Sequence, residues 1–167
     1  MDYDIEKIEL SKLLNLVNMN DADISTPDKP IIGTQSLATC FGVLLYDEDQ
    51  KIGIVAHFTH NIEDTIIKIL KLLDFDQEYK FKYIIFPGYY SKDQDPYNTQ
   101  PRLEHFFQDF KMDNLQFIPF DKKDLSDQAI SEGYLSYQFA FDTRTGQFVT
   151  DKVLFGQDYI ETSQKNR

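Results

Sequence analysis

Residues 38–58 of the chain read ATCFGVLLYDEDQKIGIVAHF, and this stretch predicts the centre of the fold. Its two apolar runs, Ala38–Tyr46 and Lys51–Phe58, are rich in the branched and aromatic residues that favour β-strands. The polar segment Asp47–Gln50 between them is typical of a tight turn. We therefore expect an antiparallel hairpin with a cysteine near the start of its first strand and a histidine near the end of its second.

The hairpin brings Cys40 and His57 together if its turn is centred between residues 48 and 49. They would then be cross-strand neighbours with Cβ atoms about 5 Å apart. An imidazole beside a thiol can take its proton and leave a thiolate nucleophile. A slip of the register by one residue would place the two side chains on opposite faces. A cysteine at a strand end can also be a small buried apolar residue, so the pattern by itself leaves both catalysis and core packing open.

Helices and further strands surround this hairpin in the predicted fold. Apolar residues at helical spacing predict helices over 5–17, 61–73 and 101–110. Short apolar runs predict strands over 81–86 and 115–120, and a second hairpin that pairs 134–141 with 147–155. Loops are predicted over 18–30, 33–36 and 91–100, and a polar tail over 156–167. Hairpin strands with helices beside them predict a single α+β domain over residues 1–167, with an N-terminal helix and loop in 1–30.

Composition and charge limit the classes of partner and location. The formal net charge is −11, and a surface that acidic repels phosphate backbones and anionic lipid headgroups. We therefore expect neither nucleic acid nor a membrane as partner, but a protein with a basic surface. A single cysteine excludes an intrachain disulfide and fits a reducing compartment. No secretory signal is predicted in residues 1–20, so we expect the cytoplasm, or delivery into another cell as an effector without an N-terminal signal.

Three segments of the chain together resemble the chemoreceptor glutamine deamidase (CheD) family: Gly33–Cys40, Val43–Asp47 and Lys51–Phe58. Thr34, six residues before Cys40, and His57, seventeen residues after it, match the threonine and histidine spacings of that family. The segments 81–88 and 139–146 are similar to its middle strand and its closing hairpin. The resemblance spans roughly residues 32–150 and is sharpest over 33–58.

This resemblance implies an α/β sandwich of mostly antiparallel and mixed sheets flanked by helices. It also implies a thiol hydrolase that needs no cofactor and deamidates a glutamine or asparagine side chain of a protein through a thioester. Cys40 would be the nucleophile and His57 the base, with Thr34 orienting His57 through its hydroxyl or its backbone carbonyl. Cytotoxic necrotising factor catalytic domains belong to the same wider group. So does protein N-terminal asparagine amidohydrolase, which requires a free α-amine and whose cysteine region is similar to Ala38–Cys40.

The chain departs from the family around the cysteine. Ser36 and Ala38 stand where the family usually has glycines, which permit unusual backbone angles and close approach to a substrate. The bulky Phe41 follows the cysteine. These departures motivate an alternative function, that of a non-catalytic protein-binding module that keeps the deamidase fold. A catalytic Cys40 is expected to have a lowered thiol pKa, whereas an ordinary thiol favours the binding module.

The remaining histidines and the tyrosine pair are expected to lie outside the site. His60 is predicted to face away from His57 or to begin the next helix. A metal site built from Cys40, His57 and His60 lacks the usual zinc spacing, and no metal is expected. Tyr89 and Tyr90 are expected in the core rather than in a cleft.

Overall fold

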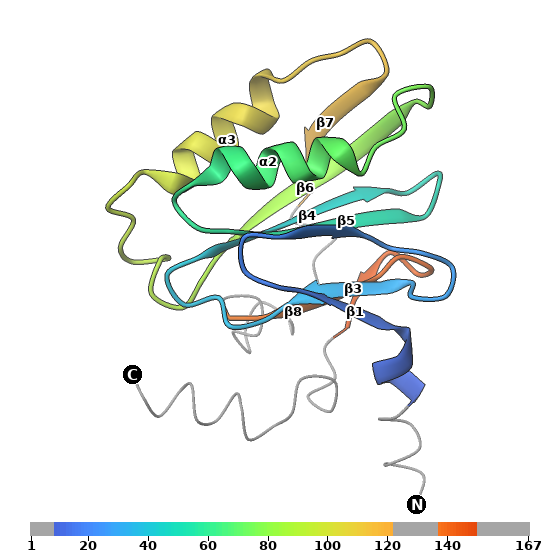
Figure 1. The fold of residues 1–167 in the computed structure, drawn as a ribbon, viewed down its shortest axis with the longest axis horizontal. Coiled ribbons are helices and arrows are strands. Elements are labelled where there is room, and N and C mark those ends of the chain that lie inside the picture. Colours follow the sequence, from blue (N-terminus) through green and yellow to red (C-terminus); the bar gives the residue numbers. More distant parts are fainter. Residues whose placement is uncertain (1–8, 122–136, 150–167) are drawn as a thin grey trace, which may run out of the picture.

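A computed structural model describes residues 9–121 and 137–149, which form two β-sheets and a layer of helices (Figure 1). The first sheet contains, in spatial order, β2 (Ala22–Ile24), β5 (Ile52–Phe58), β4 (Phe41–Asp47), β6 (Tyr79–Pro87) and β7 (Leu115–Pro119). The second contains β1 (Leu14–Val17), β3 (Ile31–Thr34), β8 (Phe139–Asp142) and β9 (Gln147–Phe148). Helices α2 (Ile62–Lys71) and α3 (Thr99–Asp109) cover the free face of the first sheet. The prediction of an α+β fold with mixed sheets flanked by helices is confirmed.

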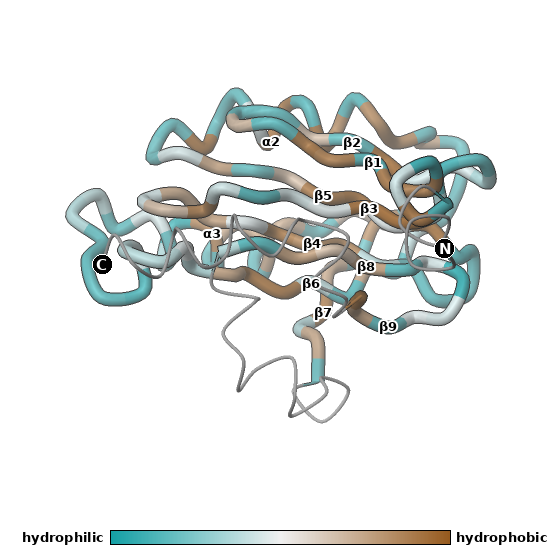
Figure 2. Tube along the Cα trace, turned by 90° about the horizontal axis from the view of Figure 1, so that it is seen from below, coloured by the Kyte–Doolittle hydropathy of each residue, from teal (hydrophilic) through white to brown (hydrophobic). Residues whose placement is uncertain are grey.

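Strand β4 is buried on both faces because it lies in the middle layer. Its residues Phe41, Val43 and Leu45 pack toward the helices, in one apolar cluster with residues of α2 and α3. Leu44 and Tyr46 alternate with them and pack toward the second sheet. Figure 2 shows the hydrophobic residues gathered along the central strands and the hydrophilic ones in the connecting turns. The face of β4 and β5 that meets the second sheet is the face that carries the candidate site.

The predicted hairpin of β4 and β5 is confirmed, but its register differs by two residues. The turn extends to Lys51, whose φ of 56° lies in the left-handed region, so β5 starts only at Ile52. Asp47 therefore pairs with Ile52, and Gly42 rather than Cys40 pairs with His57. The predicted direct pairing of Cys40 with His57 is wrong. Because the shift is an even number of residues, both side chains still point to the same face.

The N-terminal region differs from the predicted helix and loop. Residues 9–13 are helical, but 14–17 form β1, which pairs in parallel with β3. Part of the predicted loop over 18–30 is strand β2, which pairs antiparallel with β5. The helical spacing within 5–17 was misleading because strand formation there depends on partners that are distant in the sequence.

The predicted loop over 33–36 is also wrong at its start, where Gly33 and Thr34 complete β3. A Cβ on Gly33 would overlap the carbonyl oxygen of Phe139 in β8. The glycine therefore allows a close approach of two strands, whereas in the sequence it resembles a loop signal. This correction matters for function, since it places Thr34 in a buried sheet position.

The other predicted elements lie close to their expected bounds. Helices α2 and α3 and strands β6 and β7 differ from the predictions by at most two residues at either end. Asn61 occupies the N-cap position of α2 but makes no side-chain capping hydrogen bond. Strands β8 and β9 form the second hairpin, and Gly146 has the expected positive φ, 71°. The outer parts of that hairpin, 134–136 and 150–155, and the tail 156–167 lie outside the described residues.

The loop that carries Cys40 is held by the segment after β6. The amide of Gly88 donates to the carbonyl oxygen of Cys40 over 2.9 Å, and the Ser91 hydroxyl donates to the same oxygen over 2.8 Å. The amides of Tyr89 and Tyr90 donate to Leu37 and Ala38. A Cβ on Gly88 would lie 2.5 Å from the Leu37 carbonyl oxygen, so the two segments can approach this closely only with glycine at position 88.

We expect Gly88→Ala to destabilise the protein by about 1–3 kcal/mol or more, since the added methyl group meets backbone atoms that cannot turn away. The midpoint of urea unfolding measures this loss. The accessibility of Cys40 to alkylation should change as well, because the clash lies against its loop. An unchanged midpoint would contradict the close packing of these two segments.

Candidate active site

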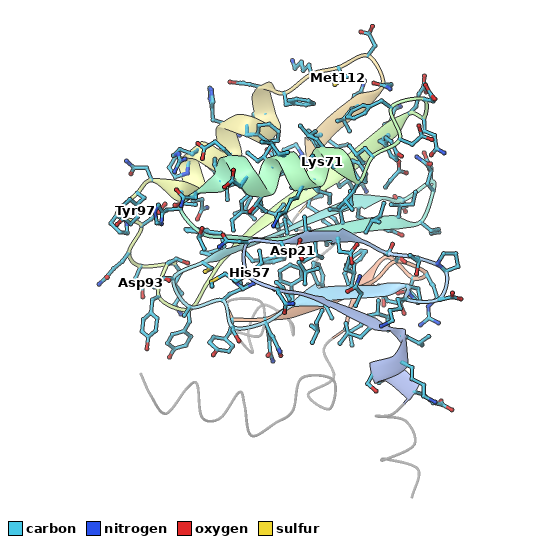
Figure 3. The ribbon with its side chains drawn as sticks, viewed as in Figure 1. Asp21, His57, Lys71, Asp93, Tyr97 and Met112 are labelled. Atoms are coloured by element: carbon cyan, nitrogen blue, oxygen red, sulfur yellow. The ribbon has the colours of Figure 1, made fainter. Side chains whose placement is uncertain are left out.

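Three strand ends place Thr34, Cys40 and His57 in one region between the two sheets. Thr34 is the last residue of β3, Cys40 directly precedes β4, and His57 is the penultimate residue of β5. Figure 3 labels His57 between the sheets. Gly42 pairs with His57, and Cys40 lies two residues before Gly42. Cys40 and His57 are thus diagonal neighbours, a relation that brings Cβ atoms to about 7 Å in regular sheets.

A chain of two hydrogen bonds determines which nitrogen of His57 carries a proton. The Thr34 hydroxyl donates its only proton to the carbonyl oxygen of Val17 over 2.8 Å. Thr34 Oγ1 also lies 2.7 Å from His57 Nδ1, and it can only accept in this second bond. Nδ1 therefore carries the proton in the neutral ring, and the lone pair is on Nε2. The predicted contact between Thr34 and His57 is present, and it is made by the hydroxyl.

Burial keeps His57 neutral. Its exposed fraction is only 3%, and burial lowers the pKa of the imidazole from 6.5 to about 4. Nε2 is buried and has no hydrogen-bond partner among the described residues. The unpartnered lone pair can accept a proton, but burial makes this ring a weaker base than a free imidazole.

This lowered pKa predicts a pH-dependent stability. Between pH 6.5 and 4 the unfolded chain binds a proton at His57 that the folded chain does not, so stability falls as the pH falls through this window. The loss amounts to at most about 3 kcal/mol by pH 4. Urea unfolding at several pH values checks it, with His57→Gln as the reference that lacks the titrating group. Parallel pH curves for the two proteins would contradict a neutral, buried His57.

Cys40 is a buried thiol in the resting structure. Burial raises the pKa of the thiol, and a hydrogen bond with the Thr39 side chain opposes this in part. The lowered pKa that we expected of a catalytic cysteine is therefore not found. The reason is that the neutral His57 supplies no positive charge, and Nε2 makes no hydrogen bond to the thiol. The pair rests as a neutral thiol and a neutral imidazole.

The loop before Cys40 offers hydrogen-bond donors for a developing negative charge. The backbone amides of Thr39 and Cys40 donate no backbone hydrogen bond within the described part of the chain. Two adjacent free amides beside a nucleophile can stabilise an oxyanion. Ser36 has a φ of 62°, the left-handed conformation for which a glycine would be suited. Ser36 thus adopts the left-handed backbone conformation that a glycine at position 36 would favour, although it is not a glycine.

A cavity of about 550 Å³ opens beside Cys40. Cys40 and Thr39 line it, together with side chains from the segments 19–20, 59–61 and 90–99. Its size is in the range of pockets that bind small ligands or a segment of a partner.

His60 and Tyr90 line the cavity too, so the expectation that both lie outside the site is wrong. Tyr89 is buried, as expected. Nothing in the local spacing marks His60 or Tyr90, because the segment 90–99 approaches Cys40 only in the folded chain.

We expect Thr34→Val to lower the rate of Cys40 alkylation at pH 7 by about tenfold or more, because the imidazole loses the group that sets its tautomer. The change also leaves the Val17 carbonyl and His57 Nδ1–H unpaired in the interior, at a cost of about 1–3 kcal/mol. Thr34→Ser keeps the hydroxyl and is the matched control. Equal alkylation rates for the valine and serine variants would show that Thr34 does not position His57.

Comparisons with known proteins place the chain in no family: no family model and no curated protein matches it. Within residues 9–121 and 137–149, none of the helices has the length and hydrophobicity that crossing a bilayer requires. Over the same residues, no group of three or more His, Cys, Asp and Glu side chains is arranged to hold a metal ion.

Proposed function

We propose that the chain is a cysteine-dependent amidohydrolase that deamidates a glutamine or asparagine side chain of a protein. The observation that carries this proposal is the tautomer of His57, in which Nδ1 carries the proton. The unpartnered Nε2 of this ring is free to accept a proton, and His57 lies on the same sheet face as Cys40. The arrangement agrees with the roles that the deamidase resemblance implies for Thr34, Cys40 and His57. The cavity supports it further, since Cys40 lines a space that a carboxamide side chain can enter.

The resting geometry favours general-base attack over a preformed ion pair. The thiol turns from Thr39 toward His57, and Nε2 takes its proton as Sγ forms a bond with the carboxamide carbon. The carbonyl oxygen becomes an oxyanion that the amides of Thr39 and Cys40 can bind. When the C–N bond breaks, the nitrogen takes the proton from Nε2 and leaves as ammonia. Water then attacks the thioester, His57 passes a proton from the water to Sγ, and a carboxyl group remains.

A protein-binding module without turnover is the second candidate function. It is favoured by the raised thiol pKa and by the absence of a hydrogen bond between Cys40 and His57 at rest. Catalytic hydrogen bonds often form only when substrate is bound, and for this reason we place the amidohydrolase first.

The free thiol would persist in a reducing compartment, so we place the activity in cytoplasm, that of the producing cell or of another cell.

The test is ammonia release from peptides that contain a single glutamine or a single asparagine. Mass spectrometry of the peptides should show conversion of the amide to the acid, and rapid acid quenching should trap a thioester on Cys40. Acetylated peptides should react as well as peptides with free N-termini if an internal side chain is the substrate. Turnover of free N-terminal asparagine alone would indicate the N-terminal amidohydrolase instead. Peptide binding with no ammonia from any peptide would favour the binding module.

A further inference from the structure

Exposed apolar side chains gather around the cavity beside Cys40. Met19, Tyr90 and Tyr97 all line it, and their exposed fractions are 60%, 46% and 60%. A neighbouring depression that shares Asn20 and Asn61 with the cavity adds a further exposed apolar side chain, that of Ile67. Tyrosine and methionine are enriched where proteins contact partners, and a cluster of exposed apolar groups is typical of an interaction site. The cavity therefore has an apolar rim, which we define as Met19, Tyr90 and Tyr97.

Within the rim, Tyr97 is held in place before any partner binds. The Tyr97 ring stacks on the His60 ring with centroids 4.3 Å apart and planes 19° apart. Arg102 of α3 donates to the His60 carbonyl oxygen over 2.8 Å and to the Glu63 carboxylate over 3.0 Å. Arg102 thus ties α3 to the start of α2 and to the segment 59–61, which forms one wall of the cavity. A preformed surface loses less conformational entropy when it binds a partner.

Asp95 supplies the only acidic side chain among the described residues that line the cavity, and none of them is Lys or Arg. Its two carboxylate oxygens accept hydrogen bonds from the amides of Thr99 and Gln100, each over 2.9 Å. These bonds fix the carboxylate in the wall of the cavity. With a formal net charge of −11 on the whole chain, the field in the cavity favours a cationic group.

We propose that the rim and Asp95 select the substrate: a peptide segment whose target amide has an apolar neighbour and a Lys or Arg close by. This inference rests on the proposed deamidase function and names the substrate class for the same site. The target side chain enters toward Cys40, the apolar neighbour packs on Tyr97 and Met19, and the cation lies against Asp95. A basic and partly apolar segment of a protein surface meets these conditions.

The experiment uses three acetylated and amidated heptapeptides with one central glutamine. In the first, leucine and then arginine flank the glutamine on both sides, so the direction of binding does not matter. The second replaces leucine with alanine, and the third replaces arginine with glutamate. We measure kcat/KM for ammonia release with the full chain, and peptide binding to the Cys40→Ala variant.

We expect the first peptide to exceed the alanine peptide in kcat/KM by about tenfold and the glutamate peptide by about threefold, the latter preference vanishing in 1 M salt. Tyr97→Ala should remove the preference for leucine, and Asp95→Asn the preference for arginine. Asp95→Asn keeps an oxygen for the amides of α3. Phe75→Ala changes an aromatic residue that is 44% exposed but does not line the cavity, and it should keep both preferences.

The outcomes separate the two levels of the proposal. Equal turnover of the three peptides, or preferences that survive in both rim variants, would overturn the selection while leaving the deamidase in place. Selective binding to the Cys40→Ala variant without ammonia release by the wild-type chain would support the rim and overturn the deamidase. Each preference is the ratio of kcat/KM for two peptides with the same variant, so a general loss of activity in that variant does not change the ratio.

Discussion

Cys40→Ala is expected to release no ammonia from any glutamine or asparagine peptide that the wild-type chain deamidates. Loss of the attacking sulfur removes the thioester route entirely, and we expect kcat to fall by a factor of at least about 10,000. The variant should still fold, because the substitution removes one sulfur atom at a loop position. Ammonia release over time, with the circular dichroism of the variant as a check on folding, measures the effect.

Cys40→Ser is the matched control for this substitution. It keeps an atom of similar size that can bond with Thr39, yet a hydroxyl at this site is a far weaker nucleophile than a thiol. We expect it to be as inactive as the alanine variant. Deamidation that persists in either variant would place the nucleophile elsewhere and would exclude the thioester mechanism.

The second large effect concerns His57 and the pH dependence of Cys40 alkylation by iodoacetamide. Between about pH 4, where His57 becomes protonated, and the raised pKa of the thiol, the pair shares one proton. Over this range the neutral imidazole can take the thiol proton as sulfur attacks iodoacetamide, and because this general-base route needs no change of protonation beforehand, the alkylation rate should be nearly constant. In His57→Gln the thiol has no base, and the rate should rise tenfold with each pH unit. At pH 6 we expect His57→Gln to be alkylated more slowly by a factor on the order of 100, the contribution typical of a positioned general base.

Denatured protein and free cysteine provide the references for these rates. Their profiles should follow an ordinary thiol, since neither holds an imidazole beside the sulfur. If wild-type Cys40 also follows a tenfold rise per pH unit, and His57→Gln does not change it, the two side chains do not exchange a proton. The protein-binding module would then be the better interpretation of the cavity.

Sequence reasoning reached the fold class and the central hairpin because both depend on local patterns. The alternation of apolar residues placed Cys40 and His57 on one strand face, and this survived a register error of two residues. The error itself came from Lys51, whose left-handed backbone lengthens the turn, a conformation that lysine adopts only with support from its surroundings. Strands β1, β2 and β3 were missed because each is stabilised by a partner that is far away in the sequence.

By itself, the sequence pointed to the residues of the proposed chemistry: one thiol, and a histidine and a threonine at spacings that resemble those of the deamidase family. The tertiary structure decided their chemical state. Thr34 reaches His57 only because β3 packs across β5, and its bond to Val17 makes it an acceptor and fixes the tautomer. Burial between two sheets keeps His57 neutral and raises the pKa of the Cys40 thiol. The segment 90–99, which is distant from Cys40 in the sequence, forms one wall of the cavity. Protonation and access depend on what surrounds a group in space, and no pattern of neighbouring residues contains that information.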